Sequence, residues 1–453
     1  YKGKIYGIPT NKETCVPEMF MFAKELVDKY DIDISKLTTI ESLAPILSLV
    51  ASEDPEYIPF DFDSNARNLF AQDAYESLID YLPSGLQAGY ANNNYTEFGV
   101  ESSINFPNFL FPFVSSDFKR KIRATTEFGL QYNYQMRPEF LRTMASASWS
   151  YKWTQRQKIQ HRIDLINIAF LYLPRISERF KEDYINKGQN DIFQYNYQDH
   201  LIINMGYSYN YNSVGGAIVN NTIASNSYSI RFNFESAGNI MYALSKMTGI
   251  RKNANNEYAI LGIPYAQYIK GEFDFSKNIR IDYRNSFAFH AGIGIAVPYG
   301  NAKTIPFEKQ YFSGGANSVR GWSVRDLGPG SFAGKGNLLD QSGDIKLDAS
   351  IEYRSKLFWK FQGAVFIDAG NIWTVREYAN QPGGVFKFNK FYKQIAVAYG
   401  LGLRLDLDFF ILRFDGGMKA VNPAFETKKE HFPIIHPKFS RDFAFHFAVG
   451  YPF

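Results

Sequence analysis

The sequence of 453 residues contains a single cysteine, Cys15, which excludes a disulfide framework and any metal site built from several thiolates. Its 49 basic and 45 acidic residues nearly balance, which excludes the basic tail typical of nucleic-acid-binding chains. No apolar run reaches the ~18 residues of a transmembrane helix, so membrane-spanning helices are excluded. Nucleotide-binding glycine motifs and the Gly-x-Ser-x-Gly motif of hydrolases are absent as well.

Two further patterns fall short of a metal site. Residues 61–65, Asp-Phe-Asp-Ser-Asn, have the spacing of an EF-hand loop, but Ala66 replaces the required glycine and Gln72 the bidentate acid. The six histidines show no zinc-ligand spacing apart from the loose pair His431 and His436, which a solvated loop explains better. We therefore expect no metal, no cofactor and no enzymatic activity.

What the sequence does have is aromatic residues, which make up 17% of the chain. So many rings belong in a core, an interface or a membrane belt. The chain opens on Tyr1 without an apolar leader, which suggests a mature or truncated product.

The first 82 residues have a helical period. Apolar side chains of residues 18–30 recur at i, i+3 and i+4, which predicts an amphipathic helix, and further helices are predicted from about Thr39 to Val50 and over residues 65–81. Three phrases, at residues 6–12, 24–30 and 57–60, resemble the extracellular solute-binding lipoproteins of bacterial ABC importers. The resemblance implies a fragment of one lobe, which should bind no ligand by itself.

From about residue 83 the period changes to two, which is typical of strands with one apolar and one polar face. Thirteen such runs are predicted, at residues 96–106, 120–135, 140–153, 159–173, 197–211, 226–238, 264–275, 278–297, 344–358, 361–374, 393–408, 409–420 and 441–453. Short links near Asn278 and Phe409 alternate with long ones, and a short helix is expected within residues 239–263. Strands this long suit a membrane crossing, so the sequence predicts a mainly β fold with a transmembrane antiparallel β-barrel.

The last run shows the alternation most clearly. One face carries only apolar and aromatic residues, namely Phe443, Phe445, Phe447, Val449, Tyr451 and Phe453. A core or edge strand of a soluble sandwich would look similar in isolation. Repetition over thirteen runs favours an outer-membrane strand whose aromatic face meets lipid.

The longest link contains the glycine-rich motif Val319-Arg320-Gly321-Trp322. If this loop enters the barrel, Arg320 must find a carboxylate, because an unpaired buried charge is costly. Glu352 and Asp368, on two neighbouring strands, are predicted to face the lumen and are the candidate partners. Arg404, with Asp406 and Asp408 in phase, is predicted to form a lumenal charge cluster.

At these residues the sequence resembles the BamA/TamA family of outer-membrane assembly factors, also called bacterial surface antigens, and most closely its TamL-like members in Bacteroidota. The resemblance covers residues 85–453 and implies that Asp368, in Phe366-Ile-Asp-Ala-Gly370, holds Arg320, with Glu352 as a second partner. It further implies a seam between the first and last strands that admits client proteins.

Barrels of that family have sixteen strands and are preceded by periplasmic POTRA modules, whereas thirteen strands are predicted here. We therefore expect a chimera, in which residues 1–82 derive from a solute-binding protein and residues 83–453 from a barrel that lacks its first strands and POTRA modules. A divergent N-terminal domain that evolved on this barrel is the alternative.

Three functions follow. The first is a factor that assembles or translocates proteins in the bacterial outer membrane. Its partners would be outer-membrane lipids, unfolded clients and accessory lipoproteins or an inner-membrane protein, without nucleic acid. The second is a passive, porin-like barrel. The third is a solute-binding module, which only residues 1–82 support.

Overall fold

The computed structural model describes residues 5–9, 19–23, 29, 96–136, 140–176, 198–214, 226–253, 256–334, 341–407 and 410–452. The chain divides into two compact units. One comprises Tyr1–Tyr81 with Asn105–Pro107, and the other comprises Leu82–Ile104 with Asn108–Phe453.

The described part of the first unit is a pair of antiparallel strands, β1 (Ile5–Pro9) and β2 (Met19–Ala23). The predicted helix over residues 18–30 is therefore wrong for Met19–Ala23. This segment pairs with β1 over its whole length, so backbone pairing decides its conformation rather than helical periodicity. The helices predicted at 39–50 and 65–81 lie outside the described residues.

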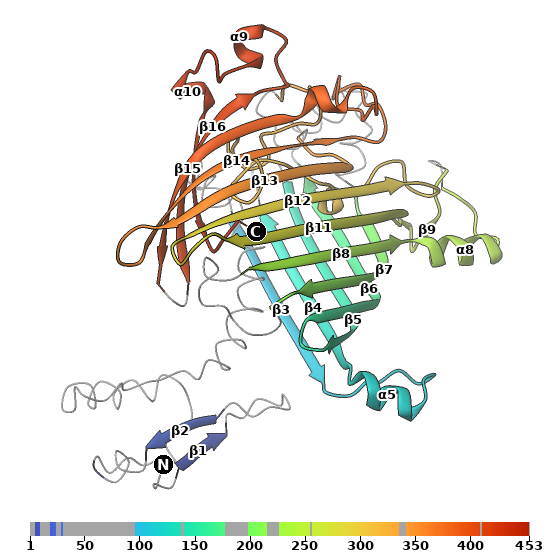
Figure 1. Cartoon of the computed structure of the whole chain (residues 1–453). Helices are drawn as coiled ribbons and strands as arrows, with labels where there is room; N and C mark the ends of the chain where they lie inside the picture. The colour runs from blue at the N-terminus through green and yellow to red at the C-terminus, as the bar shows by residue number, and fades with distance from the viewer. Residues whose placement is uncertain are drawn as a thin grey trace. The chain divides into compact units, whose positions relative to one another are not determined.

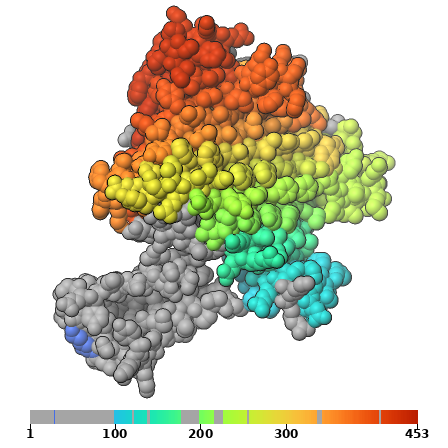
Figure 2. Space-filling view, viewed as in Figure 1, coloured from blue at the N-terminus to red at the C-terminus, as the bar shows by residue number. Residues whose placement is uncertain are grey.

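The second unit is built on one antiparallel sheet in which thirteen strands are described. In chain order they are β3 (Thr96–Phe106), β4 (Thr125–Met136), β5 (Phe140–Gln155), β6 (Ile159–Ile176), β7 (His200–Asn212), β8 (Ser227–Ala237), β11 (Tyr268–Arg280), β12 (Asn285–Pro298), β13 (Ile345–Lys356), β14 (Phe361–Trp373), β15 (Ala396–Asp406), β16 (Ile411–Val421) and β17 (Phe443–Val449). Each pairs with the next in sequence, and Figure 2 shows them as successive bands from cyan to red. The predicted fold class and the thirteen strands are confirmed.

Polarity alternates across this sheet in the sense expected of a membrane protein. On β14, Val365 and Ile367 are more than half exposed, whereas the alternate residues Phe366 and Asp368 are buried. The outer face is thus apolar and the inner face holds the polar groups, the reverse of a soluble sheet. Among the described helices, none is long and apolar enough to cross a membrane.

Short and long links fall on opposite ends of the strands from β11 onward. The links after β11, β13 and β15 are short, whereas those after β12, β14 and β16 are long (Figure 1). The remaining elements lie in links, namely α5 (Ser116–Ile122), α8 (Asn239–Met247), β9 (Ala259–Ile260), β10 (Ile263–Pro264), η5 (Phe307–Lys309), η6 (Phe391–Gln394), α9 (Lys428–His431) and α10 (Phe439–Asp442). The helix expected within residues 239–263 is confirmed as α8.

Several predicted strand boundaries are wrong, and two of them have a clear local cause. Residues 120–122 belong to α5, because Ser115 caps a helix by accepting a hydrogen bond from the Phe118 backbone N–H. The turn expected near Asn278 lies further along, since β11 continues to Arg280 and Asp282 accepts backbone N–H bonds from Arg284 and Asn285. A carboxylate that accepts from the next residues fixes a tight turn.

The sheet has two edges among the described strands, β3 and β17. The strand predicted to end at Phe453 ends at Val449, because Gly450 adopts a φ of 89° and turns the chain away from β16. Phe445 and Phe447 are each 57% exposed on the outer face as predicted. Tyr451 is not on that face. Its hydroxyl donates to Gln362 Oε1 and its ring lies 4.5 Å from the Arg354 guanidinium, while Phe453 lies outside the described residues.

Candidate functional site

The link between β12 and β13 folds against the inner face of the sheet and places the four motif residues there. Within it, the Gly315 backbone N–H donates to the Trp322 carbonyl, and the Trp322 N–H donates to the Val319 carbonyl, so residues 319–322 form a compact turn. Val319 and Trp322 are buried against Ala396 and Ala398 of β15. We call residues 313–327 the inner loop.

Arg320 is the centre of the contacts that this loop makes. Its Nε and Nη2 atoms donate to the two oxygens of Asp368, at 2.8 and 2.9 Å, and its backbone N–H donates to Asp368 Oδ2 at 3.1 Å. The guanidinium also lies 3.4 Å from the ring centroid of Phe366, two positions earlier on β14. A bidentate carboxylate and an aromatic face together fix the orientation of an arginine more tightly than either alone.

A second carboxylate lies beside the first. Arg320 Nη1 donates to Glu352 Oε2 at 2.7 Å and to Asp415 Oδ2 at 3.3 Å. The candidate partners Asp368 and Glu352 therefore both contact Arg320, and Asp415 on β16 is a third contact that the sequence did not indicate. All three carboxylates are fully buried.

Further arginines surround these acids. Glu352 Oε1 is 2.7 Å from Arg354 Nε and 2.8 Å from Arg404 Nη2, and Asp415 Oδ2 is 3.2 Å from Arg413 Nε. We call this set the charge cluster, with members Arg320, Glu352, Arg354, Asp368, Arg404, Arg413 and Asp415. Four arginines face three carboxylates, so all but one of the buried charges are compensated, in a network rather than as isolated pairs.

The backbone of the inner loop is also held. Arg413 Nη2 donates to the Ala316 carbonyl at 2.9 Å and to Asn317 Oδ1 at 2.6 Å. On β17, His446 Nε2 lies 3.0 Å from the Arg320 carbonyl oxygen. The loop thus contacts β13, β14, β16 and the edge strand β17.

The two motif glycines lie where backbones approach closely. A Cβ on Gly321 would be 2.8 Å from the Ala398 Cβ, and one on Gly370 would be 2.5 Å from the Leu347 carbonyl oxygen. Both are below ordinary contact distance, so each position accepts only hydrogen without displacing a neighbour.

Arg404 lies in the charge cluster, but its acidic partners are Glu352 and Asp415 rather than the predicted Asp406 and Asp408. Asp406 accepts a hydrogen bond from Gln362, and Asp408 lies outside the described residues. Arg413, Asp415 and His446 were missed. The sequence does contain a signal that these side chains point inward. On both strands polar residues alternate with an apolar face, and these three lie on the polar side.

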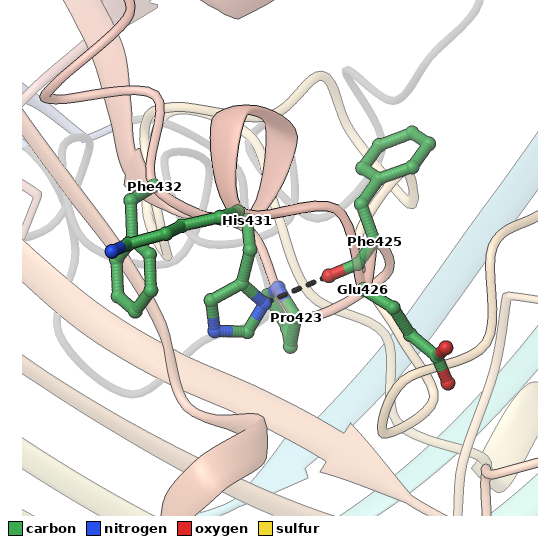
Figure 3. Close-up of a pocket in the computed structure, with 6 residues that line it drawn as sticks. Pro423, Phe425, Glu426, His431 and Phe432 are labelled. Atoms are coloured by element: carbon green, nitrogen blue, oxygen red, sulfur yellow. Dashed lines mark hydrogen bonds between the residues drawn. The ribbon is translucent and has the colours of Figure 1, made fainter.

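A surface pocket of about 410 Å³ lies apart from the charge cluster, in the link between β16 and β17 (Figure 3). It is lined by Pro423, Phe425, Glu426, Lys428, His431 and Phe432. His431 Nδ1 is 2.8 Å from the Phe425 carbonyl oxygen, a contact that closes the link on itself. No group of metal-ligating side chains is found among the described residues.

An antiparallel sheet with apolar residues outward and charged groups buried under a folded-in loop defines a protein of the bacterial outer membrane. A sequence model of the Omp85 superfamily domain matches residues 53–453, so the chain belongs to that superfamily. The match begins upstream of the boundary predicted between residues 82 and 83.

Known proteins match parts of the chain. The outer membrane protein assembly factor BamA of Neisseria meningitidis is 34% identical over 95 residues, or 19% of this chain and 11% of that protein. A carbohydrate ABC transporter substrate-binding protein of Streptococcus pneumoniae is 38% identical over 58 residues, or 13% of this chain and 12% of that protein. The chain therefore aligns with only about a tenth of the length of each.

A solved structure, BamA from Haemophilus ducreyi lacking POTRA domains 1–3, is 16% identical to this chain. The superposition covers 79% of this chain and 62% of that one, with a TM-score of 0.49.

Proposed function

We propose that this chain is part of a factor that assembles or translocates proteins in the outer membrane, through strand exchange at the edge formed by β17. Membership of the Omp85 superfamily and the partial match to an assembly factor support this class. The observation that carries the proposal is that one buried loop contacts both the inner face, through Asp368 and Glu352, and the edge strand, through His446.

An edge strand in lipid is the physical basis of the mechanism. Each unpaired backbone group in hydrocarbon costs several kcal/mol, so β17 gains free energy when another strand pairs with it. An unfolded client that offers an extended segment could add to this edge by backbone hydrogen bonds alone, with little dependence on its sequence. Among the described strands β17 pairs with β16 alone, over the seven residues Phe443–Val449, and such an exchange would use its other side.

The inner loop holds the strands next to this edge in a fixed arrangement. Release of Arg320 would leave Glu352, Asp368 and Asp415 buried without their partner, and the cost of this opposes the release. Arg320 therefore keeps β13, β14 and β16 in one register while β17 changes partners. The partners implied are outer-membrane lipids and unfolded clients. Accessory lipoproteins, an inner-membrane partner and the TamL-like subtype are part of the same proposal.

Depletion of the protein from its host, followed by complementation, tests the function. We expect lower levels of folded outer-membrane proteins on depletion, rescue by the wild-type chain and poor rescue by Arg320→Ala or Asp368→Ala. Near-normal client insertion with both variants would sink the assignment. Strong ion conductance in planar bilayers, together with unchanged client levels on depletion, would instead favour the passive, porin-like barrel.

We further propose that residues 1–82 derive from a solute-binding protein, on the basis of the three phrases that resemble such proteins and of the chain's 58-residue match to the Streptococcus protein. The superfamily match begins at residue 53, within this segment. Isothermal titration of the chain with oligosaccharides tests the solute-binding module, and we expect no heat of binding from a fragment of one lobe.

A further inference from the structure

The edge strand directs one polar side chain toward the inner loop. The inward positions of β17 are Ala444, His446 and Ala448, of which only His446 has a hydrogen-bonding side chain. It is 3% exposed, although β17 has a described neighbour on one side only. A buried polar group on an edge strand needs a partner, and here the partner is the loop.

The chemistry of the contact fixes its direction. His446 Nε2 lies 3.0 Å from the Arg320 carbonyl oxygen, and because a carbonyl oxygen only accepts, Nε2 carries the hydrogen and donates it. The bond therefore joins the side chain of the edge strand to the backbone of the very residue whose side chain enters the charge cluster.

Both ends of Arg320 are held by one cross-strand pair. Asp415 on β16 stands opposite His446 in the β16–β17 register. Asp415 accepts from the Arg320 guanidinium, whereas His446 donates to the Arg320 carbonyl. Beside them, a Cβ on Gly417 would lie 2.0 Å from the same carbonyl oxygen, so the carbonyl is pressed against β16 and points toward β17.

We propose that His446 is a positioning residue that ties the edge strand to the inner loop, so that the two are released together. This deepens the function proposed above and rests on it for its biological meaning. If β17 moves alone, the buried Arg320 carbonyl loses its donor, and if the loop moves alone, His446 loses its acceptor. Each separate movement leaves a buried polar group unsatisfied, which couples the two movements.

Hydrogen–deuterium exchange of the purified full chain in lipid nanodiscs tests the coupling without any client. In His446→Leu, we expect amides of residues 319–322 and 443–449 to exchange roughly three- to tenfold faster, the loss expected for one hydrogen bond. His446→Gln, whose amide can donate from a similar position, should restore slow exchange. Tyr451→Phe is the matched control, because it removes the Tyr451–Gln362 bond from the same chain end and should leave residues 319–322 unchanged.

A double-mutant cycle separates coupling from a merely structural role. Asp368→Asn loosens the loop from the β14 side, and we expect it to accelerate exchange of residues 443–449 in the wild-type background but not further in His446→Leu. Equal acceleration in both backgrounds, or unchanged loop exchange in His446→Leu, would overturn the proposal.

If His446→Leu yields no folded protein, the Asp368→Asn variant alone tests the proposal. Joint acceleration of the loop and of β17 supports the tie, and a faster loop with an unchanged β17 refutes it. Because no client is present, failure of this test is distinct from failure of the assembly function, which the depletion experiment measures.

Discussion

A Cβ on Gly417 would lie 2.0 Å from the carbonyl oxygen of Arg320. No side-chain carbon fits at that distance, so β16 admits the inner loop only because position 417 carries hydrogen. The glycine is required by the approach of a second backbone, and its own φ is ordinary for a strand.

Gly417→Ala should therefore displace the inner loop. We expect a loss of about 1–3 kcal/mol of stability, as for an overpacked core, and faster tryptic cleavage after Arg320. Heat-dependent mobility on gels and limited proteolysis measure the two effects.

Gly416→Ala is the matched control for this change. Its Cβ would meet the Phe443 ring at 3.1 Å and the Leu401 carbonyl oxygen at an ordinary 4.0 Å, and a ring can shift slightly where a backbone carbonyl cannot. Equal protease sensitivity of the two variants would show that position 417 has no special relation to the loop.

The strands could be predicted because alternation is a local property of the sequence. The thirteen runs were found with their order, whereas the end at Val449 was not, since a single glycine with positive φ reverses the facing of Tyr451. Likewise the helical period of residues 18–30 did not decide the structure of Met19–Ala23, because pairing with Ile5–Pro9 overrides it.

The site was predictable in part for a related reason. Arg320, Glu352 and Asp368 were indicated by charge in an apolar context and by a family resemblance. Asp415 and His446 were not, because their role depends on the register of β16 against β17, which one sequence does not specify.

Arg320→Ala should destabilise the folded chain by about 3–5 kcal/mol, the usual cost of breaking a buried ion pair. Asp368 would lose the two hydrogen bonds that it accepts from the guanidinium and keep only the one from the backbone N–H of residue 320. Arg320→Lys should fall in between, because an ammonium keeps the charge but cannot bond both carboxylate oxygens in parallel. Urea unfolding in detergent, followed by tryptophan fluorescence, gives the differences.

Arg325→Ala provides the comparison within the same loop. The Arg325 guanidinium lies 4.4 Å from the ring centroid of Phe312 and 5.0 Å from that of Phe307, and we expect its loss to cost about 1–2 kcal/mol. A cost for Arg325→Ala equal to that for Arg320→Ala would mean that the loop is held by general packing rather than by the charge cluster.

Leu401→Arg tests which face of the sheet meets lipid. Leu401 lies on the outer face of β15 and is 68% exposed. An arginine near the bilayer midplane costs about 2–4 kcal/mol, so we expect poor insertion into vesicles. Phe388→Arg, at an 83% exposed position outside the strands, should insert normally. Indistinguishable insertion of the two variants would contradict the membrane orientation.

Asp344, which lies at the end of the long link before β13, should make the stability of the folded chain depend on pH. Burial raises the pKa of this carboxyl from its ordinary 3.8 to about 6, against the opposing hydrogen bond from the Val375 backbone N–H. The folded state thus prefers the neutral acid. The contribution of the neutral carboxyl to the free energy of unfolding is fully present below about pH 4 and is lost as the pH rises through 6.

Asp344→Asn keeps the shape of the neutral acid and should remove this loss. Between pH 4 and pH 7, wild type should become less stable relative to the variant by at most about 3 kcal/mol. Asp282→Asn supplies a control of opposite sign, because hydrogen bonds from Asn285 and from the Arg284 N–H lower the pKa of Asp282. Its carboxylate stabilises above the ordinary pKa, so that variant should lose stability relative to wild type as the pH rises from 3 to 6. Parallel pH profiles for wild type and Asp344→Asn would show that the buried carboxyl stays charged in the folded chain without cost.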